Sequence, residues 1–303
     1  MQHDKYSSVY SDEELFARLR GIRHVALDMD GTIYMGMSLF DYTKPFLARL
    51  KQMGITYSFL TNNPSTSIAD YLKKLAGMGI EATADEMYTT ALATIDYLKT
   101  HLPSAKRLFI LGTQSMTSEF VKAGFEVAED SADDRPDAVV VAFDKTLSYA
   151  RLCRAAWWIQ QGLPYVATNP DRVCPTDAPT VLVDCGSICK CLEHATSRQP
   201  DITLGKPDPN MLSGIMQRYG LRADEIAMVG DRIYTDVQMA FNAGAFGVLV
   251  LSGETTLDIV AEAPRKPDLT ADNIAVLGDL LENSKFKIKN SKLHSLCSVG
   301  SKL

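Results

Sequence analysis

The sequence contains no apolar run near the roughly 18 residues that a membrane-spanning helix needs. Its opening segment is polar and charged, unlike a secretory leader. A basic excess is also missing, because 31 Lys and Arg against 37 Asp and Glu give a formal net charge of -6. An acidic chain has no general attraction for a nucleic-acid backbone. We therefore expect a cytoplasmic protein with no membrane partner and no nucleic-acid partner.

Cysteine and histidine are scarce as well. Six cysteines at irregular positions in 303 residues do not form the disulfide framework of a small secreted domain, so we interpret them as reduced thiols. The spacing of Cys185, Cys189 and Cys191 matches no zinc pattern, and no histidine pair accompanies it. These residues are expected to be ordinary helix thiols. The sequence also has no internal repeat and no low-complexity tract.

Short apolar runs that alternate with amphipathic segments are present throughout, and 46% hydrophobic residues can fill a core. This alternation predicts an α/β protein with a parallel sheet between helices. Four expected strands, 24–27, 55–60, 202–205 and 226–230, each end at a polar residue: Asp28, Thr61, Lys206 and Asp231. Expected helices follow at 43–53, 66–77, 208–219 and 234–243. Ligands of open α/β sheets bind outside the carboxyl ends of the strands, so these four residues can converge on one site.

The segment between Thr61 and Lys206 is longer than one crossover needs and has its own alternation. We expect strands at 107–111, 137–142 and 164–168 and helices at 114–123, 147–161 and 187–196. This pattern predicts a core formed by 1–90 and 199–284 and an inserted α/β cap at 91–198. The lysine-rich segment 285–303 has little helical periodicity and is expected to be a flexible tail.

The strongest local signal is the sequence DMDGT at 28–32, directly after an apolar run. Two carboxylates two residues apart can both face a crevice if the chain turns at Gly31, which tolerates a positive φ. One carboxylate can then attack while the other transfers protons. Such an Asp-Gly pair met alone is more often a simple turn, and the same holds for the other three strand ends. All four strand ends occur in the same chain and in this order, and that combination favours a functional site.

The four segments resemble the motifs of the haloacid dehalogenase superfamily: DMDGT at 28–32, FLTNN at 59–63, GKP at 205–207 and GDRIYTD at 230–236. The expected cap, with ATNPD at 167–171, makes the chain similar to the NagD or 4-nitrophenyl phosphatase branch. The resemblance implies a Rossmann-like, doubly wound parallel sheet as the core. It also implies that the cap determines substrate specificity and leaves room for a homodimer formed through the cap.

The resemblance implies a catalytic and a metal-binding set among the acidic residues. Asp28 matches the nucleophile that forms an aspartyl-phosphate, and Asp30 matches the general acid and base. Asp28, Asp231 and the main-chain carbonyl of Asp30 match the ligands of Mg²⁺, and Asp236 matches a supporting acid. Physical chemistry agrees with a cation here, because four carboxylates and a phosphate repel one another and oxygen donors suit Mg²⁺.

A phosphate-binding set is implied in the same way. Thr61 and Asn62 match groups that bind the phosphate, and Lys206 matches the cation beside it. Asn169 in the cap is expected at the mouth of the site. The resemblance implies no further cofactor besides Mg²⁺.

The expected function is Mg²⁺-dependent hydrolysis of a small phosphorylated metabolite through an aspartyl-phosphate. A phosphomutase or phosphotransferase on the same fold, or a silent phosphate-binding protein, is the alternative. Haloacid dehalogenase chemistry needs neither the second acid nor a metal, so Asp30 and the segment 230–236 argue against it. The last three residues, Ser301 to Leu303, match a peroxisomal address if the terminus is native and the cell has peroxisomes.

Overall fold

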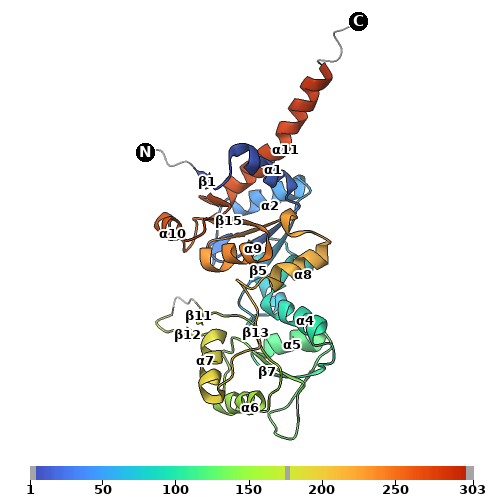
Figure 1. The fold of residues 1–303 in the computed structure, drawn as a ribbon, viewed down its shortest axis with the longest axis vertical. Coiled ribbons are helices and arrows are strands. Elements are labelled where there is room, and N and C mark those ends of the chain that lie inside the picture. Colours follow the sequence, from blue (N-terminus) through green and yellow to red (C-terminus); the bar gives the residue numbers. More distant parts are fainter. Residues whose placement is uncertain (1–4, 175–177, 298–303) are drawn as a thin grey trace. The chain divides into compact units, whose positions relative to one another are not determined.

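The computed structural model describes residues 5–174 and 178–297, with side chains described as far as Lys285. The described chain forms two compact units (Figure 1). The first comprises the residues up to Phe59 and those from Tyr219 onward, and the second comprises Leu60–Arg218. The tripeptide Ser301 to Leu303 lies outside the described residues. No helix in the described part of the chain is long and apolar enough to cross a membrane.

A seven-stranded sheet has the order β1-β16-β15-β14-β2-β5-β6. Its strands are β1 (Tyr6–Ser8), β2 (His24–Asp28), β5 (Thr56–Thr61), β6 (Met87–Thr89), β14 (Ile226–Gly230), β15 (Phe246–Val250) and β16 (Leu269–Ala271). β14 pairs in parallel with β2 and β15, and β15 pairs in parallel with β16, whereas β1 is antiparallel at the edge. β14 and β15 are buried along their whole length, which explains why they read as continuous apolar runs rather than alternating ones.

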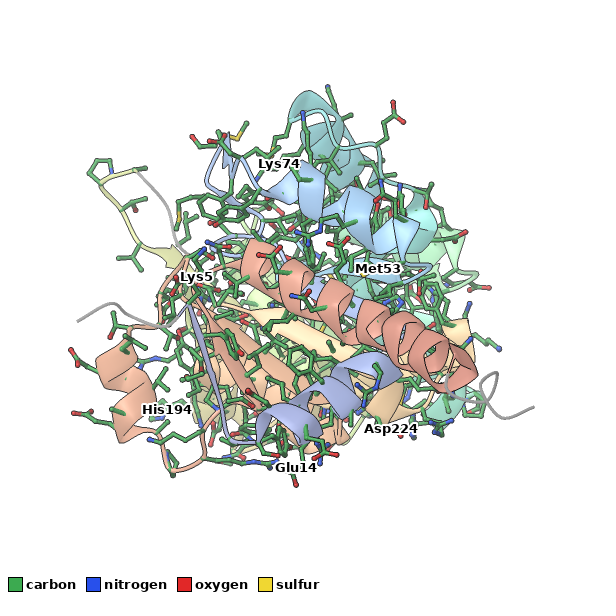
Figure 2. The ribbon with its side chains drawn as sticks, turned by 90° about the horizontal axis from the view of Figure 1, so that it is seen from above. Lys5, Glu14, Met53, Lys74, His194 and Asp224 are labelled. Atoms are coloured by element: carbon green, nitrogen blue, oxygen red, sulfur yellow. The ribbon has the colours of Figure 1, made fainter. Side chains whose placement is uncertain are left out.

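The first unit contains five α-helices in its described part. They are α1 (Asp12–Gly21), α2 (Thr43–Gln52), α9 (Gln238–Ala243), α10 (Leu257–Glu262) and α11 (Ile274–Cys297). α11 contacts both α1 and α2, and Figure 2 shows α11 and α1 lying next to each other. α1 begins at a capping box in which the Ser11 hydroxyl accepts from the Glu14 N–H and Glu14 accepts from the Ser11 N–H. It then buries Leu15 and Leu19 against its neighbours.

A five-stranded parallel sheet organises the second unit, in the order β13-β10-β9-β7-β8. The strands are β7 (Arg107–Leu111), β8 (Glu126–Val127), β9 (Ala138–Val141), β10 (Tyr165–Ala167) and β13 (Ile202–Thr203). The helices are α3 (Ile68–Gly77), α4 (Thr90–His101), α5 (Gln114–Lys122), α6 (Tyr149–Gln160), α7 (Cys185–Thr196) and α8 (Asn210–Tyr219), of which α8 runs one residue into the first unit.

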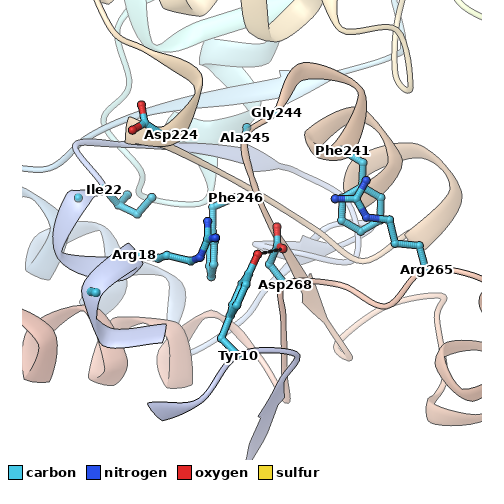
Figure 3. A pocket seen from close by; sticks show the side chains of 12 residues that line it. Tyr10, Arg18, Ile22, Asp224, Phe241, Gly244, Ala245, Phe246, Arg265 and Asp268 are labelled. Atoms are coloured by element: carbon cyan, nitrogen blue, oxygen red, sulfur yellow. Dashed lines mark hydrogen bonds between the residues drawn. The ribbon is translucent and has the colours of Figure 1, made fainter. Parts of the chain in front are cut away.

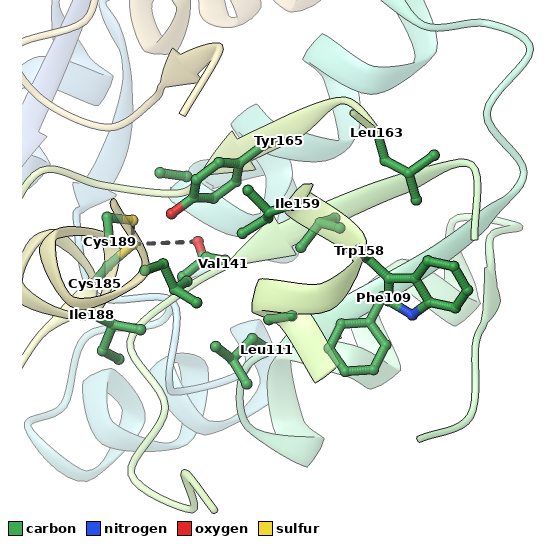
Figure 4. Close-up of a cluster of buried hydrophobic side chains, with 14 of the residues drawn as sticks. Phe109, Leu111, Val141, Trp158, Ile159, Leu163, Tyr165, Cys185, Ile188 and Cys189 are labelled. Atoms are coloured by element: carbon green, nitrogen blue, oxygen red, sulfur yellow. Dashed lines mark hydrogen bonds between the residues drawn. The ribbon is translucent and has the colours of Figure 1, made fainter. Parts of the chain in front are cut away.

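The two faces of this second sheet are covered by different helices. Side chains of a strand alternate between faces, so Val139 packs in one core and Val140 in the other. The Val139 core includes residues of α6 and α7, among them Trp158 and Cys185 (Figure 4). The Val140 core includes residues of α4 and α5. Cys185 and Cys189 are buried helix thiols, as the sequence predicts.

Short elements complete the described chain. Two hairpins are formed by β3 (Tyr34–Met35) with β4 (Ser38–Leu39) and by β11 (Val173–Cys174) with β12 (Leu182–Val183). Single 3₁₀ turns span Ala84–Glu86 and Ala223–Glu225, and a π-helical turn spans Ile233–Val237.

Two expectations from the sequence need correction. The expected strand 202–205 is β13, which lies in the five-stranded sheet, so only three of the four expected strand ends belong to the seven-stranded sheet. Its two residues pair with β10, and no local sequence pattern predicts that pairing. The segment 285–303 was expected to have little helix, but α11 continues through Cys297.

The predicted domain boundaries, at 90/91 and 198/199, remain a prediction. The compact units divide instead at Phe59/Leu60 and Arg218/Tyr219. Hydrogen bonding places β6 in the seven-stranded sheet, whereas the density of contacts places it in the second unit.

Candidate functional site

Three carboxylates gather at the carboxyl ends of two adjacent strands of the first unit. One oxygen from each of Asp28, Asp231 and Asp236 lies within 4.8 Å of the others. Asp28 ends β2 and Asp231 follows β14, and these strands are paired in register with Leu27 opposite Val229. Asp231 and Asp236 are buried and Asp28 is partly buried. We call these three residues the acidic cluster.

The loop 252–254 holds the Asp231 carboxylate in place. The Glu254 N–H donates to Oδ2 of Asp231 at 2.7 Å. A Cβ on Gly253 would lie 2.0 Å from the same oxygen, so only glycine leaves room for it. Sequence reasoning missed this loop. The rule that ligand sites lie at strand ends would have found it, because the apolar run at 246–250 ends directly before it.

The turn after Asp30 brings the chain close to the same carboxylate. Gly31 has a φ of +84°, and a Cβ there would lie 2.4 Å from Oδ2 of Asp231. The Gly31 N–H donates to the Tyr34 carbonyl at 2.8 Å, and the Ser252 hydroxyl donates to the Gly31 carbonyl at 2.7 Å. The sharp turn at Gly31 that the sequence predicts is therefore confirmed.

Asp236 enters the cluster from the π-helical turn Ile233–Val237. Its Oδ2 accepts from the Arg232 N–H at 3.1 Å, and a Cβ on Gly230 would lie 2.2 Å from its Cγ. One-turn π-bulges of this kind re-aim a side chain within a helix. The sequence predicts a supporting role for Asp236, whereas the structure places its carboxylate directly beside Asp28 and Asp231.

Asp30 lies apart from the cluster although it is two residues from Asp28. Its side chain is exposed, and its Oδ1 accepts from the Gly36 N–H in the β3–β4 hairpin at 3.4 Å. Asp28 instead accepts from the Thr32 hydroxyl at 3.3 Å. The two carboxylates of the DMDGT segment therefore have different surroundings, as different chemical roles require. The metal contact expected from Asp30 is through its main-chain carbonyl, and it remains a prediction.

A divalent cation fits the donor set of the cluster. All three donors are carboxylate oxygens, which suit hard cations such as Mg²⁺ and Ca²⁺. Two oxygens that share one ion lie at most about twice the metal–oxygen distance apart, which is about 4.2 Å for Mg²⁺ and up to about 5 Å for Ca²⁺. The oxygens of the acidic cluster, which lie within 4.8 Å of one another, fall at the upper end of this range. Across residues 5–174 and 178–285, no other group of three or more acidic, His or Cys side chains meets the same criterion.

Arg232 places a permanent positive charge near the cluster. Burial acts to lower the pKa of its guanidinium, but the charges of Glu254, Asp231 and Asp28 outweigh burial and raise it overall. Its Nε donates to Glu254 at 2.8 Å. Burial together with the neighbouring Glu254 raises the pKa of Tyr234 to about 12. Arg232 therefore offsets part of the negative charge, and the sequence analysis did not single it out.

The predicted phosphate-binding residues lie in the second unit. Asn62 and Lys206 are brought together by a two-way contact: the Lys206 N–H donates to Oδ1 of Asn62 at 2.7 Å, and Nδ2 of Asn62 donates to the Lys206 carbonyl at 3.1 Å. Lys206 is only 4% exposed. Thr61, the residue before Asn62, accepts from the Asn63 N–H at 3.2 Å. The side chain of Asn62 thus holds the backbone of Lys206, and the expected contact of Asn62 with a phosphate remains a prediction.

Asn169 joins the same set through two further acids that the sequence analysis did not name as site residues. Oδ2 of Asp171 accepts from Nδ2 of Asn62 at 2.9 Å and from Nδ2 of Asn169 at 3.0 Å. Nδ2 of Asn169 also donates to Asp184 at 3.0 Å. Burial raises the pKa of Asp184 to about 6, against the opposing hydrogen bond from Asn169. We call Asn62, Asn169, Asp171, Asp184 and Lys206 the lysine network.

A cavity of about 420 Å³ within the first unit is not part of this chemistry (Figure 3). It lies at the amino ends of the strands, beside Phe246 at the start of β15 and Ile22 before β2. The acidic cluster lies at the carboxyl ends of the same sheet. Asp268 in the cavity is already bound by the Tyr10 hydroxyl and the Gly247 N–H, both at 2.7 Å. We assign the chemistry to the carboxyl ends of the strands, where the acidic cluster lies.

Comparison with known proteins gives consistent matches over most of the chain. Residues 25–126 match the family model of haloacid dehalogenase-like hydrolases, and residues 203–277 match a HAD-hydrolase-like model. An acid sugar phosphatase of Staphylococcus aureus is 32% identical over 234 residues, which cover 77% of this chain and 88% of the relative.

Two solved structures are similar in fold and sequence. The 4-nitrophenylphosphatase of Thermotoga maritima has a TM-score of 0.81 and 38% identity, covering 86% of this chain and 98% of that one. A glycerol phosphate phosphatase of Mycobacterium tuberculosis in complex with calcium has a TM-score of 0.76 and 30% identity, covering 85% of this chain and 75% of that one. The matched segments include Asp28, Thr61, Lys206 and Asp231.

Proposed function

Because the chain belongs to the haloacid dehalogenase-like hydrolases and is a phosphatase, we propose that it hydrolyses small phosphate monoesters with Mg²⁺ through an aspartyl-phosphate at Asp28. The observation that carries this proposal is the acidic cluster, in which the proposed nucleophile shares a site with two buried carboxylates. A lone nucleophilic carboxylate would repel a phosphate dianion. A cluster that can hold a divalent cation removes that obstacle.

In the proposed reaction an oxygen of Asp28 attacks phosphorus while the bond from phosphorus to the ester oxygen breaks. Asp30 gives its proton to the departing oxygen, and the alcohol leaves. Asp30 then takes a proton from water as the water oxygen attacks phosphorus, which breaks the bond to Asp28 and releases inorganic phosphate. Both carboxyl groups return to their starting states, so two displacements replace one difficult step.

The other residues bind, orient and balance charge. Asp28, Asp231 and Asp236 would hold Mg²⁺, which when bound would neutralise charge on the phosphate oxygens and orient them. Gly31, Gly253 and the Glu254 N–H keep Asp231 in place. Lys206 is proposed to contribute the second positive charge on the phosphate, on the strength of its motif, and Thr61 is proposed to donate to a phosphate oxygen.

The relatives favour a substrate class. Their names describe an acid sugar phosphatase, a glycerol phosphate phosphatase and a 4-nitrophenylphosphatase. Sugar and polyol phosphates are therefore the proposed substrates, with 4-nitrophenyl phosphate as a convenient reporter. The same relatives support a divalent cation, since one of them was solved with calcium. Mg²⁺ is the ion that proteins usually bind through a few carboxylates together with substrate phosphate oxygens and water.

The test is phosphate release from 4-nitrophenyl phosphate, glycerol phosphate and a panel of sugar phosphates by purified protein, with Mg²⁺ and with EDTA. We expect stoichiometric release of inorganic phosphate with Mg²⁺, loss with EDTA and recovery when Mg²⁺ is restored. Full activity in EDTA would contradict the role of the metal. Transfer of phosphate to another position of the sugar, without release, would contradict hydrolysis.

A further inference from the structure

The side-chain amide of Asn62 has no group left over for a ligand in this arrangement. A primary amide has one carbonyl oxygen and one NH₂ group. Oδ1 accepts from the Lys206 N–H at 2.7 Å, while Nδ2 donates to the Lys206 carbonyl at 3.1 Å and to Asp171 at 2.9 Å. Asn62 therefore fixes the backbone of Lys206 on both sides of its Cα. A main-chain position held in this way also fixes where the lysine side chain begins.

Asp171 reinforces the orientation of the Asn62 amide. An ionised carboxylate only accepts hydrogen bonds, so Oδ2 of Asp171 can face the NH₂ group of Asn62 but not its carbonyl oxygen. A flipped amide would set oxygen against oxygen at Asp171. It would also set Oδ1 against the Lys206 carbonyl and Nδ2 against the Lys206 N–H. Asp171 thus adds a third contact that favours the same amide orientation as the Lys206 N–H and carbonyl.

Asn169 also holds Asp171 in place. The same Oδ2 accepts from Nδ2 of Asn169 at 3.0 Å. Asn169 is fully buried, its Oδ1 accepts from the Thr168 hydroxyl at 2.8 Å, and its Nδ2 also donates to Asp184 at 3.0 Å. Hydrogen bonds that are linked in a partly buried network restrain the side chains that make them. The position of Asp171 is therefore set by neighbours rather than by solvent.

The chain just before Lys206 is confined as well. Gly205 has a φ of +78°, and a Cβ there would lie 3.0 Å from both Cβ of Asn169 and the Thr168 carbonyl. The main chain at Gly205 and Lys206 is thus held by close packing against residues 168–169 and by hydrogen bonds to the Asn62 side chain. Both constraints come from residues that are distant in sequence, 62 and 168–171, and neither is visible in the GKP motif.

We propose that Asp171 is a positioning residue for Lys206, acting through the side-chain amide of Asn62. The proposal rests on the role of Lys206 in phosphate binding given above. Asp171 does not touch the substrate in this account. It holds the amide that holds the lysine, as outer-shell partners hold the ligands of a metal.

The experiment compares Asp171→Leu with the control Asp130→Leu, which removes the same charge from an exposed position of the same unit. Asp130 makes an ion pair with Arg154 at 3.2 Å and is not a member of the lysine network. The readouts are kcat, KM, inhibition by inorganic phosphate and the Mg²⁺ activation constant. We expect Asp171→Leu to lower kcat/KM by about 10- to 100-fold and to weaken phosphate inhibition about 10-fold. The Mg²⁺ constant should stay unchanged, because the acidic cluster is made of other residues.

A double-mutant cycle with Lys206→Met separates positioning from a general structural effect. If Asp171 acts through Lys206, adding Asp171→Leu to Lys206→Met should change kcat/KM by less than about 2-fold. Fully additive losses, or a loss no larger than that of Asp130→Leu, would overturn the proposal. Wild-type activity in Lys206→Met alone would instead refute the proposed function. Asp171→Asn keeps one acceptor oxygen and should give an intermediate loss, which provides the same test if the leucine variant does not fold.

Discussion

The acidic cluster of the first unit and the lysine network of the second are built on opposite principles. The cluster sets three carboxylates of like charge within 4.8 Å, an arrangement that calls for a cation. The network consists mainly of amides and carboxylates that bind one another around one peptide, and Asn62 and Asn169 have their amide groups occupied. The comparison teaches that the acidic cluster calls for a cation to offset its charge, whereas the lysine network is preorganised by hydrogen bonds.

The substitution with the largest expected effect on the acidic cluster is Asp28→Asn. It removes the nucleophile while leaving the lysine network intact, so kcat should fall by roughly four orders of magnitude or more. Thermal unfolding should remain close to wild type, because Asp28 is only partly buried. Single-turnover assays of the purified variant measure this. Retention of more than about one tenth of the wild-type kcat would refute the assignment of Asp28.

Asp30→Asn should have the next largest effect and should separate proton transfer from metal binding. General acid–base catalysis contributes about 10²- to 10⁴-fold, so kcat is expected to fall by that amount. The loss should be smaller for 4-nitrophenyl phosphate than for glycerol phosphate, because nitrophenolate leaves without needing a proton. Binding of Mg²⁺, followed by calorimetry, should be unchanged because the Asp30 carboxylate lies outside the cluster. Equal losses on both substrates would count against the role of Asp30 as an acid.

Mg²⁺ should stabilise the protein through the acidic cluster alone, and not through the lysine network. At a concentration 100 times the Kd, binding to the folded state adds about 2.7 kcal/mol to the free energy of unfolding. Gly253→Ala places a Cβ 2.0 Å from Oδ2 of Asp231 and should weaken Mg²⁺ binding about 10-fold or more, reducing this gain by about 1.4 kcal/mol. The control is Gly21→Ala, where the nearest atom lies 3.9 Å away. Equal stabilisation of both variants by Mg²⁺ would contradict the cluster as the binding site.

The smallest predicted effect is a pH dependence that differs between the units. Burial lowers the pKa of His24 in the first unit to about 4, so the unfolded chain binds more protons between pH 4 and 6.5 and stability falls as the pH falls through that window. Burial raises the pKa of Asp184 in the second unit to about 6. The folded state therefore binds more protons between about pH 3.8 and 6, and this contribution to stability is lost as the pH rises through that window.

Replacing His24 removes one of these two opposite pH dependences of stability, so the contribution of His24 can be measured by difference. From pH 7 to 5, wild type should lose about 2 kcal/mol of unfolding free energy relative to His24→Gln, measured by urea unfolding at each pH. Nδ1 of His24 contacts the Thr56 hydroxyl at 2.8 Å, and the glutamine keeps a polar group for that contact. Parallel pH profiles for wild type and His24→Gln would show that His24 is not the titrating group.

The sequence was sufficient to predict the family and the α/β fold class, and both are confirmed. Motifs such as DMDGT and GDRIYTD are local, and a strand followed by a polar turn leaves a clear pattern. That is why Asp28 and Asp231 could be expected at one sheet edge before any coordinates.

What the sequence did not reveal depends on long-range packing. Which sheet β13 joins is decided by pairing with β10, 35 or more residues away, and neither strand is long enough to carry a distinctive pattern. The Glu254 N–H on Asp231 and the Asp171 carboxylate on Asn62 join residues 23 and 109 positions apart. Such contacts are set by tertiary structure, so a single sequence can indicate a loop at a strand end but not the residue that the loop contacts.

The most direct measurement is chemical trapping of the intermediate. Sodium borohydride reduces an acyl phosphate, which would convert Asp28 to homoserine, and peptide mass spectrometry locates the change. We predict homoserine at position 28 in protein quenched during turnover with Mg²⁺ and glycerol phosphate, and none with EDTA or without substrate. Turnover at the normal rate with no modification at residue 28, or with modification at a different carboxylate, would contradict the account.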